Sequence, residues 1–322
     1  MEAAELAPIE CLDSALEVIG NTPLIRLRRV AGDASVCVLV KLEYLNPAGS
    51  IKDRIAVAMI DDAERRGLLK PGGTIIEPTS GNTGASLAMV AAIRGYRCIV
   101  VTPEKTSAEK VATMRAYGAT VIVTPNASED DPRAYTNVAS RLARETCGAY
   151  MPDQYSNPAN PAACKHTIGA EIWRQTRGRV THLVAGMGTG GTICGIARAL
   201  KERKPGVVVT GVDPIGSVYS GGEAKPYLVE GIGRHYFPKT LDMSVIDAIE
   251  RVSDREAFEM ARRIAREEGL LVGGSSGAAL VAATRVAQRV VDSGALVVAV
   301  LPDSGRAYLS KIFNDEWLNN VS

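Results

Sequence analysis

The stretch VAGMGTGGTICG, Val184 to Gly195, follows an apolar run that predicts a strand and leads into a segment that predicts a helix. Its glycines, Gly186, Gly188 and Gly191, have the spacing G-x-G-x-x-G of dinucleotide-binding turns. A second apolar run ends at Asp213, roughly where such a unit keeps the acid that binds a ribose. Free backbone N–H groups at a helix start bind anions, so this turn suits either a dinucleotide or a single phosphate.

Outward from this turn, short apolar runs rich in β-branched residues alternate with helical periods, which is typical of parallel sheets covered by helices. The predicted strands are 36–42, 74–77, 98–102, 120–124, 182–185, 207–212 and 296–301. A capping box formed by Thr106 and Glu109 predicts the start of a helix that stops at Gly118. The Pro-rich stretch 151–161 interrupts the alternation and is the predicted crossing point between two lobes.

Composition indicates an ordinary globular protein. The chain has 322 residues, 46% hydrophobic and 23% charged, which is enough for two domains or lobes. The net charge of +1 gives no basic footprint for nucleic acid. The N-terminal residues lack the pattern of a signal peptide and no apolar run reaches membrane-span length, so a cytoplasmic protein without membrane partners is expected. Six scattered cysteines and three histidines predict no metal site.

Two further Gly/Ser/Thr-rich turns precede predicted helices. They are EPTSGNTGAS, 77–86, and VGGSSGAAL, 272–280. A single turn of this kind is common between a strand and a helix and needs no ligand. In an open α/β fold, however, such turns lie together at the carboxyl edge of a sheet, where ligands bind. Three anion-binding helix starts together predict a small ligand with more than one anionic group.

Lys52, in the stretch NPAGSIKDRIA, is placed unusually at the start of an amphipathic helix, where acids are preferred. It could be a solvated surface lysine beside Asp53. Alternatively, burial and the positive helix end lower its pKa and make it a usable nucleophile for a Schiff base.

The chain contains NPAGSIKDR, EPTSGNTG, PDQYSNPAN, GMGTGGT, VEGIG, GGSSG and LPDSGR in the order and at the separations found in one family. In these motifs it resembles the pyridoxal-phosphate enzymes of the cysteine synthase and cystathionine β-synthase family, from about Gly20 to about Trp317. The resemblance implies the two-lobed α/β architecture called fold type II, with mostly parallel twisted sheets flanked by helices. It implies a smaller lobe at 45–152 and a larger lobe formed by 1–44 and 153–322.

The resemblance implies that the cofactor is pyridoxal 5'-phosphate and that the glycine turn holds its lone phosphate rather than a dinucleotide. The residues that match the phosphate turn are Gly188, Thr189, Gly190, Gly191 and Thr192. Lys52 is implied as the residue that forms the Schiff base and then moves the α-proton of the substrate. Asn82 is implied as the partner of the ring hydroxyl, and Ser275 as the group facing the pyridine nitrogen. A hydroxyl cannot keep that nitrogen protonated as a carboxylate would, which favours elimination of a β-substituent.

The remaining matched residues imply a substrate subsite. The α-carboxylate of an amino acid is expected to be held by Thr79, Ser80, Asn82, Thr83 and Gln154. Tyr155 is a candidate for positioning the leaving group or second substrate, although an ordinary packing role is equally compatible. Glu230, in VEGIG, is expected near the second-substrate side of the pocket.

The run PYLVEGIGRHYFPKTLDMSVID and the forms GGSSG and PDQYSNP resemble the cystathionine β-synthase branch more closely. This branch implies formation of L-cystathionine and water from L-serine and L-homocysteine by β-replacement. The alternative is a cysteine synthase that uses O-acetylserine or O-phosphoserine with sulfide or another nucleophile. An NAD-dependent dehydrogenase and a non-catalytic cofactor-carrying scaffold are weaker alternatives. Neither haem nor C-terminal regulatory modules are expected, and a homodimer is implied by the family.

Overall fold

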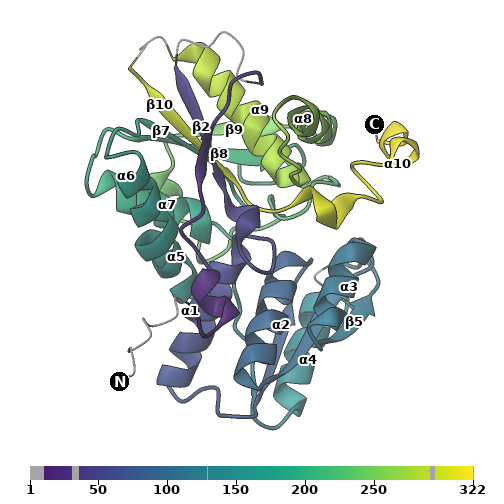
Figure 1. Ribbon diagram of the computed structural model, residues 1–322. Coiled ribbons are helices and arrows are strands. Elements are labelled where there is room, and N and C mark those ends of the chain that lie inside the picture. Colours follow the sequence, from purple (N-terminus) through teal and green to yellow (C-terminus); the bar gives the residue numbers. More distant parts are fainter. Residues whose placement is uncertain (1–10, 31–35, 129, 291–293, 322) are drawn as a thin grey trace, which may run out of the picture.

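The computed structural model describes residues 11–30, 36–128, 130–290 and 294–321, which form two sheets flanked by helices (Figure 1). The six-stranded sheet has the order β1-β2-β10-β7-β8-β9. Its strands are β1 (Leu24–Arg26), β2 (Cys37–Leu42), β7 (His182–Gly186), β8 (Val208–Pro214), β9 (Ala248–Val252) and β10 (Leu296–Leu301). The four-stranded sheet has the order β5-β4-β3-β6, with β3 (Thr74–Pro78), β4 (Arg97–Pro103), β5 (Thr120–Thr124) and β6 (Ala149–Tyr150).

The strand pairs are parallel except for β1 and β2, so the predicted α/β class with mostly parallel sheets is confirmed. The helices are α1 (Lys52–Arg65), α2 (Asn82–Arg94), α3 (Ala108–Ala116), α4 (Tyr135–Glu145), α5 (Ala159–Cys164), α6 (Ala170–Gln175), α7 (Gly191–Lys201), α8 (Asp254–Glu267), α9 (Gly274–Arg289) and α10 (Asp315–Asn319). Helices α2, α3 and α4 accompany the four-stranded sheet, and α5 to α9 accompany the six-stranded sheet (Figure 1).

Strand β10, LVVAVL, lies between β2 and β7, and all six of its side chains are buried. A strand covered by helices on both faces has no solvent face, which explains its uninterrupted apolar run. The carboxyl ends of β7 and β10 lie at the same edge because the two strands are parallel neighbours. The turns that follow them are therefore brought together.

The predicted bounds of β5 and β10 are confirmed, and the other five predicted strands differ by one or two residues. The capping box was placed wrongly, since the N-cap of α3 is Ser107, whose hydroxyl accepts from the Lys110 N–H. The Thr106 hydroxyl is instead hydrogen-bonded to that of Thr102, 2.6 Å away. The lobe boundaries near 45 and 152 stay a prediction.

In the part of the chain that the structure describes, no helix has both the length and the apolar character needed to cross a bilayer. Nor do these residues bring together three or more His, Cys, Asp or Glu side chains that could hold a metal ion.

Candidate active site

The turn between β7 and α7 presents bare backbone to a cavity lined by Gly188, Gly190 and Thr192 together with Lys52. A Cβ at Gly188 would lie 2.3 Å from the carbonyl oxygen of Gly231, and Gly190 has φ +83°. A Cβ at Gly191 would lie 1.9 Å from Asn160 Oδ1. Any residue larger than glycine would displace its neighbours at these positions. Close packing therefore explains why the turn is rich in glycine.

Hydrogen bonds fix the shape of this turn. The Thr189 hydroxyl accepts from the Gly191 N–H at 3.3 Å and from Asn160 Nδ2 at 3.0 Å. The Thr240 hydroxyl donates to the Thr189 carbonyl at 2.6 Å. The turn is therefore held in place by the protein itself, as an anion site at a helix start requires.

Asp213, the candidate ribose ligand, is fully buried at the end of β8. Its carboxylate accepts from the Ser220 N–H at 2.9 Å, and it does not line the cavities around the glycine turn. The acid therefore holds the loop that follows β8, and it lies outside the site that the dinucleotide alternative requires.

Lys52 is the first residue of α1, and its backbone N–H donates to the Ser50 hydroxyl at 3.2 Å. Its side chain lines both the cavity at the glycine turn and the adjoining inner cavity. Desolvation lowers the pKa of this amine, and the charges of Arg234 and Lys110 lower it further, while Asp303 acts in the opposite direction. The pocket therefore favours a neutral, nucleophilic amine.

The inner cavity brings together residues from eight separate segments of the chain. They are Lys52, Thr79, Ser80, Asn82, Thr83, Lys110, Gln154, Tyr155, Thr189, Gly231, Arg234, Ser275 and Pro302. Thr83 donates to Gln154 Oε1 at 2.8 Å, which joins the TSGNTG turn to the segment between the sheets. Of the sequence-predicted residues, only Gly191 and Glu230 do not line this cavity or the one at the glycine turn.

Asp303 is a buried acid beside this cavity that was not predicted as a site residue, although it lies in the quoted motif LPDSGR. It accepts from Asn82 Nδ2 at 2.8 Å and from the Tyr308 hydroxyl at 2.5 Å. Its position after a buried strand is the signal that could have identified it. Asp303 thereby orients the amide of Asn82.

Glu230 lies in the wall of an outer cavity rather than in the inner one. One oxygen accepts from Lys110 at 2.8 Å and the other from Lys311 at 2.8 Å. Lys110 and Lys311 were not predicted as site residues, and they leave Glu230 with both oxygens engaged.

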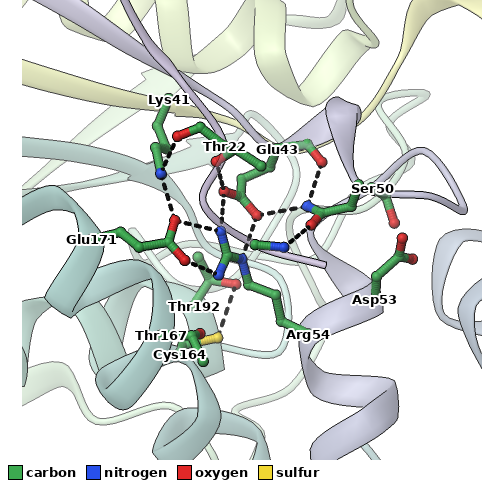
Figure 2. Close-up of polar contacts among 12 residues, drawn as sticks. Thr22, Lys41, Glu43, Ser50, Asp53, Arg54, Cys164, Thr167, Glu171 and Thr192 are labelled. Atoms are coloured by element: carbon green, nitrogen blue, oxygen red, sulfur yellow. Dashed lines mark hydrogen bonds and ion pairs between the residues drawn. The ribbon is translucent and has the colours of Figure 1, made fainter. Parts of the chain in front are cut away.

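Helix α1 is anchored by a buried charge network centred on Arg54, two residues after Lys52. Figure 2 shows its guanidinium between the carboxylates of Glu43 and Glu171, and Lys41 on the far side of Glu171. The Arg54 bonds to the two glutamates measure 2.7 to 2.9 Å. These contacts fix the first turn of α1, and so the base of Lys52, against β2 and α6.

Comparison with known proteins identifies the family. The sequence profile described as "Pyridoxal-phosphate dependent enzyme" matches residues 15–303. The chain belongs to the pyridoxal-phosphate dependent enzymes. Its cofactor is pyridoxal 5'-phosphate, so the dinucleotide alternative is set aside.

This pyridoxal-phosphate dependent enzyme is similar to named relatives. It is 49% identical over 94% of its length to cystathionine beta-synthase of Apis mellifera, and 48% identical over 95% to that of Rattus norvegicus. It spans only 62% and 56% of those two proteins. An O-acetylserine dependent cystathionine beta-synthase from Helicobacter pylori matches with TM-score 0.88 and 42% identity, covering 94% of this chain and 99% of that one. An O-ureido-L-serine synthase matches with TM-score 0.89 and 38% identity, covering 97% and 100%.

The residues of this pyridoxal-phosphate dependent enzyme fit the cofactor on structural grounds. The glycine turn offers backbone N–H groups at the start of α7, and a lysine of lowered pKa lines the same cavity. Thr189 and Thr192, whose hydroxyls can donate to an anion, also line that cavity. A terminal phosphate at the turn, and an aldehyde within reach of Lys52, suit this set of donors.

Glu77 supports the site from the end of β3, and its titration makes a testable prediction. Its carboxylate accepts from the backbone N–H groups of Asp153 at 2.9 Å and Gln154 at 3.1 Å. Burial raises the pKa of Glu77 from 4.5 to about 8. Between these values the folded state binds the proton more tightly, so this group makes the free energy of unfolding fall as pH rises.

We expect the Glu77→Gln variant to lose less stability than wild type between pH 6 and pH 8.5. Urea denaturation of both proteins at the two pH values measures how much the free energy of unfolding changes in each. Groups that titrate in both proteins contribute equally, so the difference between the two changes reports on Glu77 alone. Parallel changes in the two proteins would show that Glu77 does not titrate in this window.

Proposed function

We propose that this enzyme catalyses β-replacement on an L-serine-type amino acid, forming L-cystathionine and water from L-serine and L-homocysteine. The observation that carries the proposal is Lys52, an amine of lowered pKa in a cavity shared with the glycine turn. The likeness to cystathionine beta-synthases at 48% to 49% identity supports the choice of reaction.

Pyridoxal 5'-phosphate, when bound, supplies an electron sink for negative charge at the α-carbon of the amino acid. In the proposal, Gly188, Thr189, Gly190, Gly191 and Thr192 hold its phosphate. Asn82 donates to the ring hydroxyl while Asp303 orients its amide. Ser275, buried in the first turn of α9, faces the pyridine nitrogen.

The substrate is bound and deprotonated by the remaining residues. Thr79, Ser80, Asn82, Thr83 and Gln154 clamp the α-carboxylate, and the Thr83 to Gln154 hydrogen bond aligns two of these donors. Lys52 Nζ takes the proton from the α-carbon and returns one after addition of the thiol. Tyr155, whose pKa burial raises well above its ordinary range, stays protonated and faces the β-substituent.

A second reaction is favoured by a specific observation. The Helicobacter pylori relative is an O-acetylserine dependent cystathionine beta-synthase. O-acetylserine is therefore the alternative donor here, and a cysteine synthase using O-acetylserine or O-phosphoserine with sulfide is the alternative enzyme. Either reaction would serve amino-acid biosynthesis, and the first would be a step of transsulfuration.

The proposal is tested by steady-state kinetics of the purified holoenzyme. Serine with homocysteine, O-acetylserine with homocysteine, and O-acetylserine with sulfide are compared by kcat/KM. We expect the homocysteine pairs to be preferred. Turnover of the sulfide pair alone would make the enzyme a cysteine synthase, and absence of turnover in all pairs would contradict β-replacement.

Homodimeric assembly and a cytoplasmic location complete the proposal. Sedimentation velocity of the purified protein tests the first, and a monomer at micromolar concentration would contradict it.

A further inference from the structure

Arg234 is a cation at the junction of two cavities. It lines the inner cavity with Lys52 and Ser275, and it also lines the outer cavity of about 270 Å³ that contains Glu230. The two cavities share Ser80, Gly231 and Arg234, so a substrate extending outward from the inner cavity passes this side chain.

The described residues give Arg234 no anionic partner. Its Nη2 donates to the Tyr155 hydroxyl, and the guanidinium carbon lies 4.5 Å from the centroid of the Tyr155 ring. Its Nε is buried and has no hydrogen-bond partner in the described part of the chain. Stacking on a tyrosine stabilises a guanidinium without neutralising its charge. Removing an ion from water is costly when no counter-charge offsets it, and the described residues supply none to Arg234.

The outer cavity around Arg234 is also rich in positive charge. Lys105 and Lys311 line it, and Lys311 already shares Glu230 with Lys110. Lys105 has no carboxylate partner among the described residues. Desolvation lowers the pKa of Lys105 and the nearby charge of Arg234 lowers it further, while the charge of Glu230 acts in the opposite direction. Glu104 and Glu230 also line this cavity, but both oxygens of Glu230 are engaged by lysines, and neither acid pairs with Arg234 among the described residues. Arg234 therefore remains available to an anion.

We propose that Arg234, with Lys105, binds a negatively charged group that a substrate carries beyond the β-carbon of the donor. The group is the carboxylate of an incoming thiol or the phosphate of an O-phosphoserine donor. This inference rests on the proposed β-replacement function. A planar guanidinium forms two parallel hydrogen bonds with either group, and the cavity is near the lower limit of roughly 300 Å³ for small-ligand sites.

The test compares wild-type holoenzyme with the Arg234→Gln variant on matched thiols. The first is 3-mercaptopropionate, and the second is 2-mercaptoethanol, in which a neutral hydroxyl replaces the carboxylate on the same two-carbon chain. We expect the KM for 3-mercaptopropionate and for homocysteine to rise about 10- to 100-fold, with less than twofold change for 2-mercaptoethanol. In the donor arm, a selective rise for O-phosphoserine over O-acetylserine would assign the subsite to the leaving phosphate. Parallel changes for charged and neutral compounds in both arms, or no change, would overturn the proposal.

Two variants and one binding measurement separate this inference from its alternatives. Arg234→Lys keeps the charge and should restore part of the selectivity, whereas Lys239→Gln removes an exposed lysine of the same segment and should change nothing. Calorimetric titration with 3-mercaptopropionate requires no turnover. Binding that is weakened at least tenfold in Arg234→Gln would support the subsite even if the wild-type enzyme failed to catalyse β-replacement, and equal binding by both proteins would overturn it.

Discussion

Replacement of Lys52 by alanine is expected to reduce kcat/KM for β-replacement by at least about 10⁴-fold, because in the proposed function this amine both bonds to the cofactor and moves the α-proton. No other amine among the described residues can substitute for it. Lys110 also lines the inner cavity, but its ammonium donates to Glu230 at 2.8 Å and to the Tyr308 hydroxyl at 2.7 Å.

A readout besides activity distinguishes this role from a structural one. After borohydride treatment and denaturation, wild-type protein should retain the cofactor covalently on the peptide that contains Lys52, and Lys52→Ala should release it. Lys239→Ala is the matched control, because this lysine is exposed and lies outside the cavities around Lys52. Activity of Lys52→Ala within tenfold of wild type, or cofactor retained by that variant, would contradict the assignment.

The parts of the site that the sequence predicts are those encoded locally. The glycine turn follows strand β7 and opens helix α7, and its Gly188 and Gly190 are required by close approach and by a positive φ. Such strand, turn and helix signals lie within about ten consecutive residues. These local signals are why the two Gly-rich turns could be placed at helix starts before the fold was known, whereas the role expected for Lys52 came from the family resemblance.

The parts that the sequence did not predict depend on contacts between distant segments. Asn82 meets Asp303 across 221 residues, and Lys110 meets Tyr308 across 198. The hydrophobic periodicity of a sequence does not indicate which buried acid will lie opposite which hydrogen-bond donor. Strand β9 was missed for a related reason, since its pattern of exposed and partly buried residues, AIERV, comes from its place at the edge of the sheet beside β8.

The charge network beneath Lys52 was also hidden in the sequence. Arg54, Glu43, Lys41 and Glu171 are 4%, 0%, 0% and 8% exposed, and they come from α1, the segment after β2, β2 itself and α6. Lys41 donates to Glu171 at 2.6 Å. Two positive and two negative groups balance, so the cluster is neutral and every carboxylate oxygen in it accepts at least one hydrogen bond.

We expect Arg54→Ala to lower the free energy of unfolding by about 3 to 5 kcal/mol, because it leaves two buried carboxylates short of their main partner. The pairing with Arg54 and Lys41 holds the pKa of Glu171 at about 2, below its ordinary 4.5. Stability from this pairing is therefore present above pH 4.5 and lost as pH falls towards 2. Urea denaturation of wild type and Arg54→Ala at pH 7 and at pH 4 measures this effect. The difference in free energy of unfolding between the two proteins should be larger at pH 7 than at pH 4.

The matched control is Arg65→Ala, on the same helix. Arg65 is 72% exposed and pairs with Asp62 at 2.7 Å, an arrangement that contributes about 0.5 kcal/mol or less. Because Arg54 holds the first turn of α1, its loss should also lower kcat in the fraction that remains folded, whereas Arg65→Ala should not. If the two variants lose equal stability, or if the Arg54→Ala deficit grows on acidification, the buried network does not anchor Lys52 by the pairing described.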